Sequence, residues 1–224
     1  MPEIASTSLF SAASLVAYYK LENVNDSDSG AVHLTNNNTV TFIAGNFNNC
    51  ASFNGSNQSL SVNNSLGIDG GSMSISAWIN PTTVTSALDH LSYASLYGDT
   101  TKTSYGLTLG TTGIRASRLR ASVAWDDGAQ FAITASVWTH AVLTYDGTNL
   151  RLYLNGVLQD TFACSGSGSG SATSKTTLGC RSDQDSLTGQ INTRLDDVGF
   201  FNVALTQAQI TEIFKGGSNF FLTF

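Results

Sequence analysis

Short segments of alternating apolar and polar residues restrict this chain to a fold built mainly from β-strands. In residues 73–79, every second residue from Met73 to Ile79 is apolar. Because successive side chains of a strand point to opposite faces of a sheet, this spacing predicts a strand with one buried face. Residues 150–156 alternate in the same way and end in Asn155-Gly156, a pair that favours a tight hairpin turn.

The rest of the chain continues this pattern of short strands between turn residues. One helix is predicted over residues 207–214, since Thr206 and Gln209 have the spacing of a capping box and Gly216 follows the last apolar residue. Neither an internal repeat nor a linker divides the sequence, so we expect one domain over residues 1–224. Further strands are predicted at residues 105–109, 119–125, 138–145, 175–180 and 195–201.

The surface of this domain must be polar without being highly charged. Charged residues make up only 12% of the chain, so Ser, Thr, Asn and Gly have to cover much of the surface. The net charge is −6 with 10 Lys and Arg residues, and we therefore expect no nucleic-acid partner. No apolar run approaches the ~20 residues that cross a bilayer, and no basic segment of a secretory signal is visible, so we expect no membrane insertion.

Three cysteines cannot all pair with one another. Cys50 lies in an apolar segment and is expected to be a small buried residue. Cys164 and Cys180 flank a loop rich in Gly and Ser, and the sequence leaves open whether they form a disulfide. The C-x-x-C pairs of a zinc site are absent from the sequence between them.

Five segments, taken in order along the chain, carry a family resemblance. Residues 15–21 read LVAYYKL, residues 45–55 read GNFNNCASFNG, and residues 74–81 read SISAWINP. Residues 138–156 contain WTHAVLTYDG and LRLYLNG, and residues 195–206 run from LDDV to ALT. Together these segments resemble the laminin G-like jelly rolls of the concanavalin A-like superfamily, in their bacterial and phage form.

This resemblance implies an all-β fold in which two antiparallel sheets, each of roughly six or seven strands, pack as a jelly-roll sandwich. One short helix is expected in the C-terminal region. The resemblance also implies a role in adhesion or carbohydrate recognition. Because one fold serves many functions, the ligand has to be argued from the site.

Many members of this family hold a structural calcium ion between an acidic N-terminal loop and the closing strand. The matching residues are Asp26 or Asp28 in the loop and Asp196 in the strand. Ca²⁺ binds six to eight oxygen atoms from carboxylates, backbone carbonyls and water, and a loop of Gly, Ser and Asp can supply them. The alternative is that these aspartates cap turns through neighbouring backbone N–H groups.

A surface that binds sugars combines aromatic rings with polar side chains. Trp125 ends a predicted strand and precedes Asp126 at a turn, so both are candidate ligand-binding residues. Tyr93 and Tyr97 lie in residues 84–103, which we expect to form a loop of the kind that carries variable recognition. Ordinary packing of these aromatic side chains is the alternative interpretation.

The carboxylates do not follow the pattern of a glycoside hydrolase, which needs two carboxyl groups about 5–10 Å apart. The three glutamates, Glu3, Glu22 and Glu212, lie at the terminus, after the first strand and in the helix. Asp126-Asp127 and Asp196-Asp197 are neighbours on strands, so the two members of each pair are expected to point to opposite faces. Nucleophile-elbow and phosphate-loop motifs are also missing, and we expect no catalytic activity.

These observations favour a non-catalytic, lectin-like or adhesion module that binds a glycan or a surface protein and carries structural calcium. The alternative is a structural protein of a phage virion or cell surface whose sandwich mediates assembly. Both hypotheses imply an extracellular, cell-surface or virion location. The apolar tail at residues 219–224 either completes an edge strand or docks on a second copy of the chain, which would make a homo-oligomer.

Overall fold

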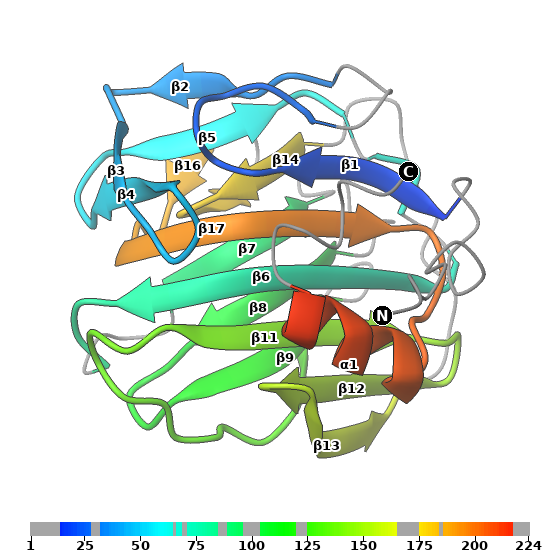
Figure 1. Ribbon diagram of the computed structural model, residues 1–224. Coiled ribbons are helices and arrows are strands. Elements are labelled where there is room, and N and C mark those ends of the chain that lie inside the picture. Colours follow the sequence, from blue (N-terminus) through cyan, green and yellow to red (C-terminus); the bar gives the residue numbers. More distant parts are fainter. Residues whose placement is uncertain are drawn as a thin grey trace, which may run out of the picture.

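The computed structural model shows two antiparallel β-sheets packed face to face, with a helix on the outer side of the larger sheet (Figure 1). This arrangement confirms the predicted all-β jelly-roll sandwich. The apolar tail at residues 219–224 lies outside the described part of the chain. The structure describes residues 14–27, 32–64, 66–68, 71–84, 89–95, 104–119, 125–164, 175–183 and 186–216.

The larger sheet has eight strands, and seven of them follow one another in a single hydrogen-bonded order. The eighth, β1 (Leu15–Tyr19), pairs with β17 beside β4. The order of the other strands is β13 (Val157–Ala163), β12 (Asn149–Leu154), β11 (Thr139–Tyr145), β6 (Met73–Pro81), β17 (Asn192–Phe201), β4 (Asn49–Asn54) and β3 (Thr41–Ala44).

The smaller sheet has seven strands and lies behind the first in Figure 1. A separate two-stranded sheet is formed by β15 (Arg181–Asp183) and β16 (Ser186–Thr188). The order of the seven strands is β10 (Trp125–Asp127), β9 (Ile114–Leu119), β8 (Ser104–Leu109), β7 (Asp89–Ser95), β14 (Lys175–Leu178), β5 (Ser59–Val62) and β2 (Thr35–Asn37).

The hydrophobic core fills the space between the two sheets. The alternating residues of β6, from Met73 to Ile79, have no exposed surface, as the sequence predicts. Leu107 on β8 and Ala116 on β9 belong to the same core cluster and come from the opposite sheet. The alternation of the strands therefore determines which side chains enter the core and which face outward.

Strand β17 holds the eight-stranded sheet together because it pairs with three other strands. It pairs with β6 on one side, and on the other side with β4 through residues 192–195 and with β1 through residues 198–201. Between these two halves the register with β6 shifts by a β-bulge, and Asp197 adopts a φ of 46°. The bulge thus lies where β17 changes its partner from β4 to β1.

Helix α1 (Gln207–Gly216) covers the outer face of the eight-stranded sheet (Figure 1). The predicted capping box is present: the Thr206 backbone N–H donates to Gln209 Oε1 at 2.8 Å, and the Gln209 N–H donates to Thr206 Oγ1 at 3.4 Å. Ile210 and Ile213 are buried on the sheet. The sheet residues of this cluster are Val142, Tyr153 and Phe201. Within the described ranges, no helix has both the length and the apolar character needed to cross a membrane.

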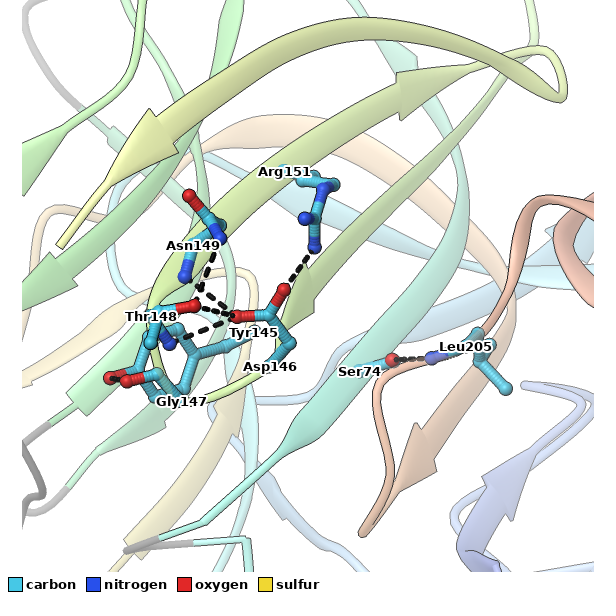
Figure 2. Close-up of polar contacts among 8 residues, drawn as sticks. All are labelled: Ser74, Tyr145, Asp146, Gly147, Thr148, Asn149, Arg151 and Leu205. Carbon is cyan, nitrogen blue, oxygen red and sulfur yellow. Dashed lines mark hydrogen bonds and ion pairs between the residues drawn. The ribbon is translucent and has the colours of Figure 1, made fainter. Parts of the chain in front are cut away.

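Two hairpin turns in the larger sheet follow the sequence prediction. At the first, Asp146 Oδ1 accepts hydrogen bonds from the backbone N–H groups of Thr148 and Asn149, at 2.9 and 2.7 Å (Figure 2). Its other oxygen lies 2.6 Å from a guanidinium nitrogen of Arg151 (Figure 2). At the second, Asn155 and Gly156 have φ values of 48° and 78°, as a tight hairpin turn requires.

Two predictions about the smaller sheet are wrong. The sequence predicts a loop over residues 84–103, whereas residues 89–95 form β7 in the middle of the sheet. It also predicts a strand over residues 119–125, whereas β9 ends at Leu119 and β10 begins at Trp125. Neither β7 nor β10 follows a simple alternation of apolar and polar residues. Both strands are stabilised by pairing with neighbouring strands.

All three cysteines are buried and free. Cys50 has no exposed surface, as predicted, and Cys164 and Cys180 are not bonded to each other. Burial raises the pKa of the Cys50 and Cys180 thiols to about 11. Both thiols therefore stay protonated near neutral pH.

Replacing Ser74 with alanine is expected to lower the free energy of unfolding by about 1–3 kcal/mol. Ser74 has no exposed surface. Its Oγ donates to the Val203 carbonyl at 2.8 Å. The same oxygen accepts from the Leu205 N–H at 2.9 Å (Figure 2). The substitution leaves both backbone groups without this partner. Urea unfolding measures the loss, with exposed Ser56→Ala as the control, and equal stability of the two variants would contradict the prediction.

Candidate functional site

The outer face of the seven-stranded sheet is polar, in contrast to its inner face. On β9, Ile114 and Ala116 belong to the core, so Arg115 and Ser117 face outward. Residues paired in register form a row that crosses all seven strands, over a distance of roughly 29 Å at the usual strand spacing. This cross-strand row consists of Asp127, Ser117, Gly106, Tyr93, Thr177, Ser61 and Thr35.

One end of the row contains a cluster of Arg115, Ser117 and Asp127, called here the Arg115 cluster. A guanidinium nitrogen of Arg115 lies 2.8 Å from Asp127 Oδ2, and Ser117 is the direct strand partner of Asp127. The Arg115 and Asp127 side chains are 14% and 25% exposed, whereas Ser117 has no exposed surface.

The Arg115 cluster has three buried polar atoms that the protein does not satisfy. Arg115 Nε, Ser117 Oγ and Asp127 Oδ1 have no hydrogen-bond partner among the residues that the structure describes. An unsatisfied buried polar group costs about 1–3 kcal/mol. Because these three atoms have almost no exposed surface, a ligand can reach the cluster only at the partly exposed Arg115 and Asp127 side chains.

Asp126 lies on the other side of the same strand and faces the interior. Its Oδ2 is 3.9 Å from a guanidinium nitrogen of the buried Arg118. The Arg118 guanidinium lies over the rings of Tyr145 and Tyr105, at 4.6 and 5.8 Å from their centres. Asp126 and Asp127 thus point to opposite faces, as predicted, and it is Asp127 that reaches the outer face.

The other predicted ligand-binding residues lie on two strands of the same sheet or outside the described residues. Tyr93 is on β7, in the middle of the cross-strand row by its register. Trp125 is on β10, two residues before Asp127. Tyr97 is outside the described part of the chain. The register therefore places Tyr93 and Trp125 in the sheet that carries the Arg115 cluster, and their role in binding stays a prediction.

Asp196 and Asp197 both point to the outer face of the eight-stranded sheet, which corrects the prediction that they point to opposite faces. Leu195 and Val198 on either side both belong to the core cluster. Between them, the β-bulge at Asp197 adds a residue and interrupts the alternation. The bulge thus brings two carboxylates to one side of the sheet.

Each of the two carboxylates has one oxygen that is hydrogen-bonded and one that is not. Asp196 Oδ2 accepts the backbone N–H groups of Asn46 and Phe47, both at 2.9 Å. The Tyr18 hydroxyl donates to Asp197 Oδ1. Asp196 Oδ1 and Asp197 Oδ2 are buried and have no hydrogen-bond partner in the described part of the chain.

Burial is the largest cause of a raised pKa at both residues. It raises the pKa of Asp196 to about 7, and the neighbouring charge of Asp197 adds to this effect. The pKa of Asp197 is raised by burial to about 6, although its hydrogen bond from Tyr18 lowers it; the charge of Glu22 also raises it. A cation bound between the two free oxygens would favour the ionised forms.

Asp26, the predicted calcium ligand of the N-terminal loop, hydrogen-bonds to backbone N–H groups on either side of it in the sequence. Its Oδ1 accepts the Tyr18 N–H at 2.9 Å and its Oδ2 accepts the Val32 N–H at 3.1 Å, so it caps the two ends of the loop. Burial and then the Asp26 charge raise the pKa of Tyr19, whose side chain is in the core. Tyr18, in contrast, faces Asp197.

The predicted calcium ligands are thus distributed between two places. Asp28 lies outside the described residues, and Asp26 shows the turn-capping role that the sequence left as an alternative. Among the residues that the structure describes, no group of three or more His, Cys, Asp and Glu side chains could hold a metal ion. The observation that fits a cation is the pair of unsatisfied oxygens on Asp196 and Asp197.

Sequence reasoning missed Arg115, Ser117, Asp127 and Asp197 as site residues. The first two carry a local signal, because residues 114–117 alternate as Ile-Arg-Ala-Ser and so predict an outward Arg and Ser. The apolar–polar alternation ends at Arg118, because this inward-facing position holds a charged residue. The outward Arg115 and Ser117 were therefore not recognised from the sequence. No local signal marks Asp197, since its orientation depends on a bulge.

Comparison with known proteins supports the fold. A family model described as the concanavalin A-like lectin/glucanases superfamily matches residues 53–211. A search of curated protein sequences found no match.

Several solved structures have the same fold at low sequence identity. One is domain 4 of AbnA, a GH43 extracellular arabinanase from Geobacillus stearothermophilus, solved in complex with arabinotriose. It is 20% identical in sequence, with a TM-score of 0.72, and the match covers 90% of this chain and 98% of that chain. The binding domain of Paraclostridial Mosquitocidal Protein 1 is 17% identical, with a TM-score of 0.71 and coverages of 91% and 52%. A botulinum neurotoxin type C structure, described as interacting with two ganglioside molecules, is 14% identical, with a TM-score of 0.70 and coverages of 92% and 51%. The chain thus spans about half the length of the two toxin chains, and these likenesses show the fold alone.

Asp196→Asn is expected to gain stability over the wild type as pH rises from 5 to 8 in the absence of divalent cations. The folded-state pKa of about 7 exceeds the unfolded value, so the folded wild type binds more protons in this range and loses stability as pH rises. The asparagine keeps an oxygen for Asn46 and Phe47 but carries no charge. The expected gain is about 1–3 kcal/mol.

Urea unfolding in EDTA at both pH values measures this difference. Burial lowers the pKa of His140 to about 3, so this residue makes the folded protein more stable as pH rises over the lower part of this range. Both proteins contain His140, so its contribution cancels in the comparison. Asp146→Asn is the control, because hydrogen bonds from Arg151 and the turn outweigh burial and lower the pKa of Asp146, which leaves it ionised throughout. If Asp196→Asn and the wild type show equal pH dependence, the pKa assignment is wrong.

Proposed function

Because the chain belongs to the concanavalin A-like lectin/glucanases superfamily, we propose that it is a non-catalytic module that binds a glycan on the outer face of its seven-stranded sheet. The observation that carries this proposal is the partly exposed ion pair of Arg115 and Asp127 on this face, with side chains that are 14% and 25% exposed. Sugar hydroxyls both donate and accept hydrogen bonds and can bind the exposed parts of these two side chains.

The solved structures suggest the first ligands to try. The arabinanase domain is matched over 98% of its length and was solved with arabinotriose, so arabinotriose is the first probe. A botulinum neurotoxin binding domain in complex with rat synaptotagmin II makes a surface protein the second partner class. We propose an extracellular or surface location on the same basis, since the arabinanase is described as extracellular.

The arrangement of carboxylates supports a binding role over catalysis. Asp126 and Asp127 point to opposite faces of one sheet, and Asp126 is paired with Arg118 in the interior. Asp196 and Asp197 lie on the outer face of the other sheet. A glycoside hydrolase needs two carboxyl groups that face one sugar ring. Asp196 and Asp197 share a face, but they are 0% and 3% exposed, so a sugar ring has no access to them.

We also propose that Asp196 and Asp197 hold a structural calcium ion, with Asp26 bracing the N-terminal loop. The two unsatisfied carboxylate oxygens are ligands of the type that Ca²⁺ prefers, and backbone carbonyls and water would complete its coordination. A bound cation would stabilise the bulge at which the hydrogen-bonded partner of β17 changes from β4 to β1.

Replacing Arg115 with methionine is expected to weaken glycan binding at least tenfold, a loss of about 1.4 kcal/mol. The substitution removes the Nε donor and the ion pair with Asp127 but keeps an unbranched side chain. Binding of arabinotriose and of a glycan array by wild type and variant measures the effect.

The matched control is Arg151→Met, which removes a similar ion pair with Asp146 on the other sheet (Figure 2). It is expected to leave binding unchanged. A wild type that binds no glycan, or an Arg115→Met variant that binds as well as wild type, would count against this surface as the glycan site.

Calcium is expected to raise the melting temperature of the wild type at pH 8 relative to EDTA. A ligand that binds only the folded state adds about 2.7 kcal/mol at a hundredfold excess over its Kd. The increase should disappear in Asp196→Asn and in Asp197→Asn and persist in Asp146→Asn. If calcium does not change the melting temperature of the wild type, the proposed calcium site is wrong.

A further inference from the structure

We infer that β13 joins two copies of this chain, by pairing antiparallel with β13 of a second copy. β13 ends the strand order of the eight-stranded sheet, and in the described part of the chain its one hydrogen-bonded neighbour is β12 (Figure 1). The free side of such a strand carries backbone N–H and C=O groups that another strand can bind. The larger sheet can therefore be extended at this border.

β13 differs in length and charge from the strands at the other ends of the two strand orders. β2 and β10 have three residues each, and β3 has four. β13 has seven residues, and Asp160 is the one charged residue among them. Proteins commonly prevent edge pairing with very short edge strands or with charged side chains, lysine above all. β13 has little protection of either kind.

The regular part of β13 directs free backbone groups outward at Thr161 and Ala163. The Cys164 N–H donates to the Thr148 carbonyl at 2.8 Å, on the side of β12. In an antiparallel pair, residues alternate between bonding to that neighbour and pointing their N–H and C=O away from it, so Thr161 and Ala163 point theirs to the free side. Both residues are exposed. The bulge at Gln159 precedes this stretch and leaves it regular.

Exposed apolar side chains lie at the start of the same strand. Val157 and Leu158 are 59% and 45% exposed, and they are neighbours, whereas isolated apolar residues on a surface are ordinary. Leu158 and Thr161 are paired with Tyr153 and Arg151 on β12, so both face the outer side of the sheet. A strand added beside β13 would remove part of this apolar surface from water.

A second copy fits this border because the border is complementary to itself. Antiparallel pairing about a two-fold axis at Thr161 sets the N–H and C=O of each Thr161 against those of the other. In this register Asp160 lies opposite Phe162 of the second copy, so the two Asp160 carboxylates do not face each other. Asp160 Oδ2 already accepts the Ala129 N–H at 2.7 Å within its own chain.

This pairing fixes how the two copies are oriented. A two-fold axis that relates adjacent antiparallel strands of one sheet is perpendicular to that sheet, so rotation about it keeps each face of the sheet on its own side. The outer faces of both seven-stranded sheets therefore point the same way. The consequence for binding rests on the proposed function: the dimer presents two glycan sites to one surface, and simultaneous engagement of both sites increases avidity.

Sedimentation velocity of the full chain over a range of concentrations tests the pairing. We expect the wild type to be a dimer that dissociates on dilution, because a single strand edge buries less area than a standard interface. Thr161→Pro removes an N–H that points away from β12, so it is expected to weaken the dimer at least tenfold through two lost hydrogen bonds while the chain still folds. Melting temperatures report folding.

A charge exchange at Thr161 tests the two-fold register and replaces Thr161→Pro if that variant is unstable. Thr161→Lys and Thr161→Glu each place like charges opposite each other, so each alone is expected to dimerise more weakly than the wild type. An equimolar mixture of the two should regain the dimer as a mixed pair. Thr41→Lys, on β3 at the other border of the same sheet, is the matched control and should dimerise as the wild type does.

The glycan measurements are kept apart from the dimer measurements. Immobilised arabinan is expected to bind the wild type at least tenfold more tightly than Thr161→Pro, whereas soluble arabinotriose should bind both equally. A wild type that sediments as a monomer at every concentration, or a Thr161→Pro dimer as tight as that of the wild type, would overturn the inference. Equal binding of both proteins to immobilised arabinan would contradict the inferred orientation. If no sugar binds, the proposed function fails and the sedimentation result still decides the dimer.

Discussion

The bulge in β17 is the constraint on which the larger sheet depends. One strand pairs with β6 along one side and with both β4 and β1 along the other, and the bulge at Asp197 lies where these partners meet. A regular strand would bury one of the two aspartates in the core, where Leu195 and Val198 now lie. The bulge instead places both carboxylates on the outer side, where each keeps one unsatisfied oxygen.

The smaller sheet uses regular alternation for a different purpose. On β9 and β10, alternate residues send one Arg–Asp pair inward and another outward. Arg118 lies over the rings of Tyr105 and Tyr145 and pairs with Asp126, whereas Arg115 and Asp127 remain partly exposed. The interior pair belongs to the packing of the sandwich, and the exterior pair provides the polar atoms that a ligand can use.

Much of the fold could be predicted from the sequence because its signals are local. The alternation of residues 73–79, the Asn155-Gly156 turn and the Thr206 capping box each depend on a few neighbouring residues, and all are present in the structure. The β7 strand and the break between β9 and β10 depend on pairing with distant strands, so local patterns predicted them wrongly. The family resemblance supplied the sandwich but not the position of β7 or the break between β9 and β10.

The site was predicted less well for the same reason. Asp196 was predicted as a calcium ligand, which stays a prediction. Its neighbour Asp197 was assigned to the opposite face because only the pairing of β17 with three strands produces the bulge. The structure places Tyr93 and Trp125 on strands of the smaller sheet, although Tyr93 was expected in a loop, and their role in binding stays a prediction. The Arg115 cluster escaped notice because its three residues come from two strands separated in sequence.

The central claim is that the outer face of the seven-stranded sheet binds the ligand. Amide chemical-shift mapping of the labelled protein during titration with a neutral oligosaccharide that it binds tests this most directly. The account predicts that the largest changes occur in β8, β9 and β10, around Gly106, Ser117 and Asp127, with small changes in β11, β12 and α1. Changes centred on α1 and the outer face of the eight-stranded sheet would contradict it.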